Sequence, residues 1–311
     1  MAKKPKQFVL SGLTTEQPNP LARELDTKSA LDVAQIINTE DAKVAAAVQK
    51  VLPQIATAID WVTHCLRNSG RLIYVGAGTS GRIAALDAAE CPPTFNTNPT
   101  MVQFVIAGGK RALAGATEAD EDSRTLGISE MRRKRVDKHD VVVGLAASGR
   151  TPFTVAALEH ARRSGAKTVA ITCNRGTPLA KAAELAIVVD TGPEVLAGST
   201  RMKAGTAEKM VLNILSTGAM VRLGYVYGNL MVNLHRKNSK LAERSVSIVQ
   251  QALEVTQPEA LEVLRSAHNN VPVAIVMAKA GVKRSIASKA LTLAQGHVRN
   301  AIALAKNMQD S

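Results

Sequence analysis

Residues 71–82 read RLIYVGAGTSGR and join a short apolar run to a loop of glycine, hydroxyl and arginine residues. The run at 71–76 is brief and apolar, which is typical of a strand buried on both faces. Helical spacing resumes after the loop, so we expect a strand, a loop and then a helix. The free N–H groups and the positive dipole end at the start of a helix favour an anion at such a loop.

The same order of features recurs at residues 140–153, DVVVGLAASGRTPF. We predict strands at 71–76, 102–107, 140–146, 167–172 and 185–190, with helices between them. Such alternation is typical of a parallel sheet with right-handed crossovers, so the predicted fold class is an α/β three-layer sandwich with N-terminal helices. Beyond Gly198 the strand signals vanish, and we predict only helices, including 199–222, 225–252 and a small three-helix bundle in the last 45 residues.

Two loops of one type at the ends of parallel strands predict a binding site for a phosphate group. The predicted ligands are Gly78, Thr79, Ser80, Ser148, Gly149, Arg150 and Thr151. Gly76, Gly78 and Gly81 also satisfy the G-x-G-x-x-G pattern of dinucleotide sites, but the second strand ends in Ala107 and Gly108 rather than in an acid for the ribose. Ordinary glycine-rich turns explain one such loop well, but they explain two poorly.

Acidic residues near these loops are candidates for acid/base chemistry. Glu90 precedes Cys91, Pro92 and Pro93, and we expect the prolines to end the helix there. An acid at a helix C-terminus opposes the dipole, which hints at a function for Glu90. The acids in EADED at 118–122 are favourable at a helix start for structural reasons, so none of them stands out.

Residues 192–209, GPEVLAGSTRMKAGTAEK, form a charged, glycine-jointed segment after the last predicted strand. Ser199 or Thr200 is predicted to cap the helix that follows. Such a segment suits either closure over a substrate or a contact between subunits.

Composition narrows the classes of partner. Hydrophobic residues make up 46% of the chain and aromatic residues only 3%, which disfavours aromatic stacking on nucleic acid. The 39 Lys and Arg residues exceed the 26 Asp and Glu residues, and the net charge is +13. These cations are spread out without a recognition-helix pattern, so we expect no nucleic-acid partner but a basic surface that attracts anionic substrates.

The chain has no uninterrupted apolar stretch of roughly 18 residues and begins with polar sequence, so we expect no membrane segment and a cytoplasmic location. Cys65, Cys91 and Cys173 lack metal-ligand spacing, and the histidines are scattered. We predict three reduced thiols and no metal site. The predicted domains are an N-terminal arm with helices at 1–50, an α/β domain with the two phosphate loops at 51–250 and a helical bundle at 251–311.

Two long segments carry a resemblance to a known family. They are GAGTSGRIAALDAAECPPTF at 76–95 and GPEVLAGSTRMKAGTAEKMVLNILSTG at 192–218. Here the chain resembles the N-acetylmuramic acid 6-phosphate etherase family, which belongs to the sugar isomerase (SIS) domain group and is related to the glucokinase regulatory protein. The resemblance spans nearly the whole chain, and the C-terminal bundle looks like the family's ubiquitin-associated-like (UBA-like) appendage.

The resemblance implies cleavage of the lactyl ether at carbon 3, which yields N-acetylglucosamine 6-phosphate and D-lactate in cell-wall recycling without a cofactor. A base removes the proton on carbon 2 of the open-chain aldehyde, and an acid protonates the departing ether oxygen. Water then adds. One ionised and one protonated carboxyl group suffice for this chemistry.

By the same resemblance, Glu90 looks like the acid and Glu121 like the base. Ser199 is carried over as a further substrate ligand, and Lys240 as a ligand from a partner subunit, which implies a homodimer with sites near the subunit interface. Asn233 departs from the family, which usually has an acid at that position, and this chain is unusually basic for the group.

Two other functions use the same features. An aldose–ketose isomerase would interconvert sugar phosphates without releasing lactate. A non-catalytic sugar-phosphate sensor that binds a partner protein would bind without turnover, although a single sugar-binding unit and a retained pair of glutamates argue against it.

Overall fold

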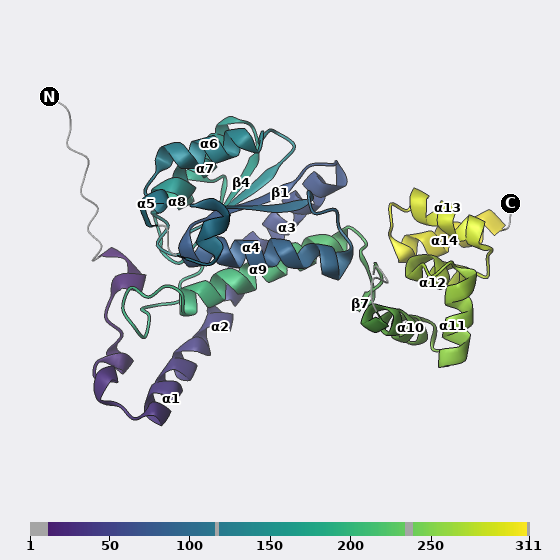
Figure 1. Cartoon of the computed structure of the whole chain (residues 1–311), viewed down its shortest axis with the longest axis horizontal. Helices are drawn as coiled ribbons and strands as arrows, with labels where there is room; N and C mark the ends of the chain where they lie inside the picture. Colours follow the sequence, from purple (N-terminus) through teal and green to yellow (C-terminus); the bar gives the residue numbers. More distant parts are fainter. Residues whose placement is uncertain (1–11, 116–117, 234–238, 310–311) are drawn as a thin grey trace. The chain divides into compact units, whose positions relative to one another are not determined.

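A computed structural model describes residues 12–115, 118–233 and 239–309 of the chain (Figure 1). Contacts divide it into two compact units, one of residues 1–88 with 100–215 and one of residues 89–99 with 216–311. The domain limits expected at 50 and 250 stay predictions. No helix within the described ranges has the length and apolar character needed to cross a membrane.

The first unit is built on a parallel sheet of five strands, all at positions predicted from the sequence. The strands are β1 (Leu72–Gly76), β2 (Val102–Ile106), β3 (Val141–Leu145), β4 (Lys167–Thr172) and β5 (Leu185–Val188). Their order is β2-β1-β3-β4-β5. After β1 the chain forms β2 at one edge of β1, and it then returns to form β3 at the opposite edge of β1. The direction of winding therefore reverses between β1 and β3, which is where open α/β sheets bind ligands.

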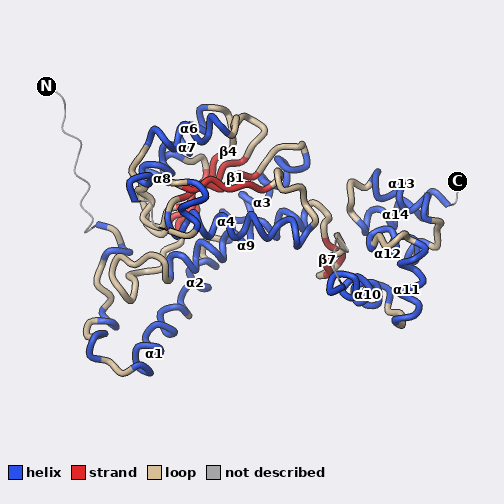
Figure 2. The backbone as a smooth tube through the Cα atoms, in the orientation of Figure 1, coloured by secondary structure: helices blue, strands red, loops and turns tan. Residues whose placement is uncertain are grey.

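Helices cover both faces of this sheet, and Figure 2 shows its strands between them. On one face, Ile73 and Val75 of β1 share a buried apolar cluster with Phe153 of α7 (Pro152–Arg163), and α7 packs along α6 (Arg124–Arg133). Tyr74 points the other way, and its hydroxyl donates to Asp87 of α4 (Gly78–Phe95) over 2.8 Å. This alternation follows from the two-residue period of a strand.

The remaining helices of the first unit complete the three layers. They are α1 (Ala30–Asp41), α2 (Lys43–Gln49), α3 (Leu52–Arg67), α5 (Glu118–Glu121), α8 (Pro178–Ala182) and α9 (Lys203–Arg222). The last residues of α4 and of α9 are assigned to the second unit. The N-terminal arm docks on this unit, because Asn174 accepts from the Thr14 N–H over 2.8 Å and Asn19 donates to the Pro193 carbonyl over 3.2 Å.

The start of α9 corrects one expectation. Ser199 and Thr200 do not cap this helix; instead, the buried Glu194 carboxylate accepts from the N–H groups of Lys203 and Ala204, over 3.0 and 2.9 Å. A carboxylate reaches two free N–H groups at once and complements the positive helix end, which a hydroxyl group does less well.

The length of α4 corrects a second expectation, which concerned the prolines. The helix does not end at Cys91 but continues through Pro92 and Pro93 to Phe95. Each proline removes one N–H donor from the helix. Helical hydrogen bonding nevertheless continues past them, since the Asn96 N–H donates to the Pro92 carbonyl over 2.9 Å. Glu90 therefore lies within a helix and not at its end.

The second unit contains a small hairpin and a helical bundle. The hairpin, β6 (Val226–Tyr227) with β7 (Leu230–Met231), contradicts the prediction of helices alone beyond Gly198. Its two-residue turn begins with Gly228 at φ +60°, a conformation that glycine adopts without strain. The last 45 residues hold three helices, α12 (Val271–Ala280), α13 (Arg284–Leu293) and α14 (Val298–Gln309), as predicted. They share one apolar core with α10 (Ser239–Leu253) and α11 (Gln257–Ser266).

A buried ion pair joins α1 to the start of α9. Lys203 and Glu40 contact each other with only 1% and 2% of their side chains exposed. Burial alone would raise the pKa of Glu40, but hydrogen bonds from Lys203 and Lys43 lower it overall. The carboxylate is therefore charged in the interior and depends on its partners.

We predict that Lys203→Met lowers the free energy of unfolding by about 3–5 kcal/mol, because it leaves a buried charge without its buried partner. Lys43→Met is the matched control, since Lys43 contacts the same carboxylate with 53% of its side chain exposed, and we expect it to cost less than about 1 kcal/mol. Urea unfolding of both variants measures the difference. Equal losses would contradict the dominance of the buried pair.

Candidate functional site

The two predicted phosphate loops leave neighbouring strands at the same level. Gly76 of β1 pairs in register with Leu145 of β3. The first loop then enters α4 at Gly78, and the second enters α7 at Pro152. The seven predicted phosphate ligands, Gly78, Thr79, Ser80, Ser148, Gly149, Arg150 and Thr151, therefore belong to two adjacent strand ends and two helix starts. Their role as ligands stays a prediction.

The second loop is held in shape by residues at the end of β4 and just after it. The Ala147 carbonyl accepts from the Thr172 hydroxyl and the Asn174 amide over 3.2 and 3.0 Å. Gly149 has φ +67°, and a Cβ atom there would lie 2.4 Å from the Thr177 hydroxyl oxygen. Only glycine fits at this position, so the loop's N–H groups are presented in one fixed arrangement.

Glu121 lies against the first loop. It is the last residue of α5, and its Oε1 would lie 3.0 Å from a Cβ atom on Gly78, whose φ is +51°. The sequence did not distinguish Glu121 from its acidic neighbours, whereas the fold places its carboxylate beside the loop. Glu121 is partly buried there, and its predicted role as the base stays a prediction.

The other predicted site residues lie outside the two phosphate loops. Glu90 is exposed on α4 and belongs to the second unit. Ser199 is half-buried in the turn before α9, and its N–H donates to the Leu196 carbonyl over 2.9 Å. Lys240 lies in the first turn of α10, and its side chain falls outside the described residues. Their proposed roles, and that of the half-buried Asn233, stay predictions.

Sequence reasoning missed one acid at this site, Glu208 on α9. Its Oε1 lies 2.9 Å from the Ser80 hydroxyl oxygen, and its side chain is only 1% exposed. Burial raises the pKa of Glu208 to about 8, against a lowering by the Ser80 hydrogen bond. A signal was present, because Glu208 falls in the helical stripe formed by the buried residues Ala204, Ala207, Val211 and Leu215.

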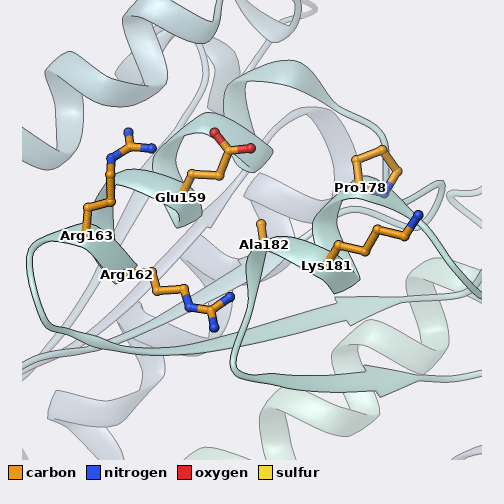
Figure 3. A pocket seen from close by; sticks show the side chains of 6 residues that line it. All are labelled: Glu159, Arg162, Arg163, Pro178, Lys181 and Ala182. Carbon is orange, nitrogen blue, oxygen red and sulfur yellow. The ribbon is translucent and has the colours of Figure 1, made fainter. Parts of the chain in front are cut away.

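A separate hollow lies on the outer side of α7 and α8. Figure 3 shows its lining residues, which are Glu159, Arg162, Arg163, Pro178, Lys181 and Ala182. None of them is a predicted site residue. Three cations and one acid on an exposed surface describe a solvated basic face rather than a built site, and Glu159 forms an ion pair with Arg124 over 2.7 Å.

Comparison with known proteins identifies the family. N-acetylmuramic acid 6-phosphate etherase 1 of Enterococcus faecalis is 46% identical over 298 residues, which cover 96% of this chain and 99% of that protein. The N-acetylmuramic acid 6-phosphate etherase of Vibrio vulnificus is 48% identical, over 94% of this chain and 98% of its own length. The chain belongs to the N-acetylmuramic acid 6-phosphate etherase family.

Matches to domain families agree with membership in the etherase family. Residues 54–162 match the glucokinase regulatory protein N-terminal SIS domain, and residues 127–217 match the SIS domain. A solved structure of a putative phosphosugar isomerase involved in capsule formation, from Bacteroides fragilis, has a TM-score of 0.51 with 19% identity, and covers 67% of this chain and 98% of its own. That likeness concerns the fold, and it agrees with the parallel sheet described above.

The raised pKa of Glu208 makes the folded state less stable as pH rises. The folded protein releases this proton near pH 8 and the unfolded chain near pH 4.3, so between these values the folded state holds one more proton. The stability that Glu208 contributes is therefore lost as pH rises from about 4.3 to about 8, by an amount on the order of 5 kcal/mol.

We predict that Glu208→Gln, which cannot ionise, gains stability relative to the unaltered protein as pH rises, and that the gain levels off above pH 8. Urea unfolding at pH 5, 7 and 8.5 measures it. Glu159→Gln makes the same substitution at a side chain that is 36% exposed, and should show no such trend. A gain that does not vary with pH would contradict the neutral state of Glu208.

Proposed function

We propose that the chain is an N-acetylmuramic acid 6-phosphate etherase, a carbon–oxygen lyase that cleaves the lactyl ether of its substrate to N-acetylglucosamine 6-phosphate and D-lactate. The observation that carries the proposal is the Glu121 carboxylate against Gly78, at the loop where a 6-phosphate would bind. The high identity to etherases along nearly the whole chain supports it.

In this proposal the two loops hold the phosphate through N–H groups and hydroxyls at the starts of α4 and α7. The attachment fixes the sugar so that its carbon 2 comes within reach of Glu121. Holding a reactant beside a catalytic group in this way removes much of the entropic cost of the reaction.

The reaction then proceeds by elimination and addition. Glu121 takes the proton on carbon 2, whose acidity comes from the neighbouring aldehyde of the open-chain sugar. The electron pair forms the carbon 2–carbon 3 double bond, the carbon 3–oxygen bond breaks, and Glu90 gives its proton to the lactate oxygen. Addition of water then places a hydroxyl group on carbon 3 and returns a proton to carbon 2.

We further propose that the enzyme acts in the cytoplasm as a homodimer, with Lys240 reaching the site of the partner subunit. The three cysteines, Cys65, Cys91 and Cys173, are buried and are not in disulfides, which suits a reducing compartment.

The first test is release of lactate from N-acetylmuramic acid 6-phosphate by the purified protein. We expect Glu121→Gln and Glu90→Gln each to lower the rate by about 100- to 10,000-fold, because a positioned acid or base contributes that much. Asp122→Asn, an exposed acid next to Glu121, is the control and should retain the rate.

Deuterium exchange at carbon 2 in D₂O separates the two roles. Glu90→Gln should still exchange this hydrogen, whereas Glu121→Gln should not. Intact substrate with the unaltered protein would contradict the proposal: a ketose product would indicate an isomerase, and binding without turnover would indicate a sensor.

A second test uses the closeness of Gly78 to Glu121. We predict that Gly78→Ala lowers the rate of lactate release by more than tenfold, since its methyl group would push the carboxylate of Glu121 away, and a displacement of about 1 Å can cost 100-fold. Gly109→Ala is the matched control, because Gly109 also has positive φ (+62°) but a methyl group there would meet no atom within 4 Å. Equal losses in both variants would point to backbone strain alone.

A further inference from the structure

Glu208 makes one contact that links the interior to the first loop. Its Oε1 lies 2.9 Å from Ser80 Oγ, and Oε2 has no hydrogen-bond partner among the described residues. Because the carboxyl group is 1% exposed and its pKa is raised to about 8 by burial, Glu208 holds a proton at neutral pH.

The position of that proton follows from the unequal partners of the two oxygens. A proton on Oε2 would leave a buried donor without an acceptor, whereas a proton on Oε1 leaves only an unpaired acceptor at Oε2. Orphaned buried donors are the rarer case in proteins. In the neutral form the proton therefore lies on Oε1 and is donated to Ser80 Oγ. In the carboxylate form the Ser80 hydroxyl donates to Oε1 across the same 2.9 Å contact.

Charged groups on α9 and α4, the two helices that the Glu208–Ser80 contact joins, have partners of their own. On its own helix, Lys203 pairs with Glu40. On α4, Arg82 donates to the carbonyls of Ala112 and Gly115, over 2.9 and 2.6 Å, and Asp87 accepts from Tyr74.

The loops after β4 and β5 add further ionisable groups. Burial holds the pKa of Cys173 well above its usual range, so its thiol is neutral. Asp190 faces Arg175 over 3.9 Å, and Glu194 accepts from two backbone N–H groups of α9. In this set of described groups, Ser80 is the one that hydrogen-bonds to the Glu208 carboxyl group.

We propose that Glu208 is a positioning residue for phosphate binding: as a neutral acid it donates to Ser80 Oγ, which turns the one hydrogen of the Ser80 hydroxyl toward a phosphoryl oxygen of the substrate. A serine hydroxyl has one hydrogen and two acceptor sites, so it can accept from Glu208 and donate to the phosphate at once. This inference rests on the proposed function, because it needs a phosphate at the first loop.

Ionisation of Glu208 reverses the arrangement. A carboxylate only accepts, so the Ser80 hydrogen turns inward and its lone pairs face the phosphate. If only the neutral form binds well, the apparent dissociation constant rises by about tenfold between pH 7 and pH 9, as the neutral fraction falls. The phosphate monoester itself is already a dianion over this range.

The experiment measures binding of N-acetylglucosaminitol 6-phosphate, an open-chain sugar alcohol that lacks the aldehyde and cannot undergo elimination. Calorimetry at pH 7, 8 and 9 should give affinities that weaken by about tenfold for the unaltered protein, as above. For Glu208→Gln the weakening should be less than threefold, since the amide N–H donates to Ser80 at every pH. The control Glu159→Gln should behave as the unaltered protein does.

Ser80→Ala distinguishes this relay from simple charge repulsion. If Glu208 acts through the hydroxyl group, adding Glu208→Gln to Ser80→Ala should not improve binding at pH 9. An equal improvement with and without Ser80 would overturn the relay, and so would an affinity of the unaltered protein that is constant from pH 7 to pH 9.

The outcome is separable from that of the proposed function. Phosphate-dependent binding with the predicted pH profile, but without lactate release from N-acetylmuramic acid 6-phosphate, would retain the role of Glu208 and overturn the etherase. Lactate release together with an affinity that does not change with pH would retain the etherase and overturn the role of Glu208.

Discussion

Parallel pairing of β1 with β3 is the constraint on which the site depends. Because the chain winds away from β1 in one direction and returns on its other side, two loops that are about 70 residues apart leave the sheet as neighbours. Each loop opens a helix, so two sets of free N–H groups point to one edge of the sheet. A single phosphate group is the kind of ligand that such an edge recognises.

The start of α9 ties the surrounding elements to this edge. Glu194 caps the helix, Lys203 pairs with Glu40 of α1, and Glu208 reaches Ser80 of α4. All three acids are buried, and a buried polar group costs free energy unless it has a partner. Each of them resolves that cost differently: Glu194 by backbone N–H groups, Glu40 by a cation, and Glu208 by holding its proton.

Carboxyl groups with different surroundings suit the chemistry proposed for this family member. Glu121 stands beside Gly78 at the loop, partly open to a ligand, whereas Glu208 is sealed beneath the same loop. In the proposed mechanism the first contacts the sugar, and the second acts through Ser80. The proposal thus gives one residue type a chemical role and a positioning role, because exposure decides what a carboxyl group can do.

Local patterns in the sequence determined the five strands, the two glycine–hydroxyl loops and the three C-terminal helices, because buried strands, tight loops and helix periodicity leave marks over a few neighbouring residues. Local rules failed where distant contacts prevail: α4 runs through Pro92 and Pro93, and Glu194 replaces Ser199 or Thr200 as the cap of α9. The choice of Glu121 within EADED and the pairing of Glu208 with Ser80 required the tertiary structure. Those two facts depend on which residues meet across about 40 and about 130 positions of chain, a distance over which a single sequence carries no local signal.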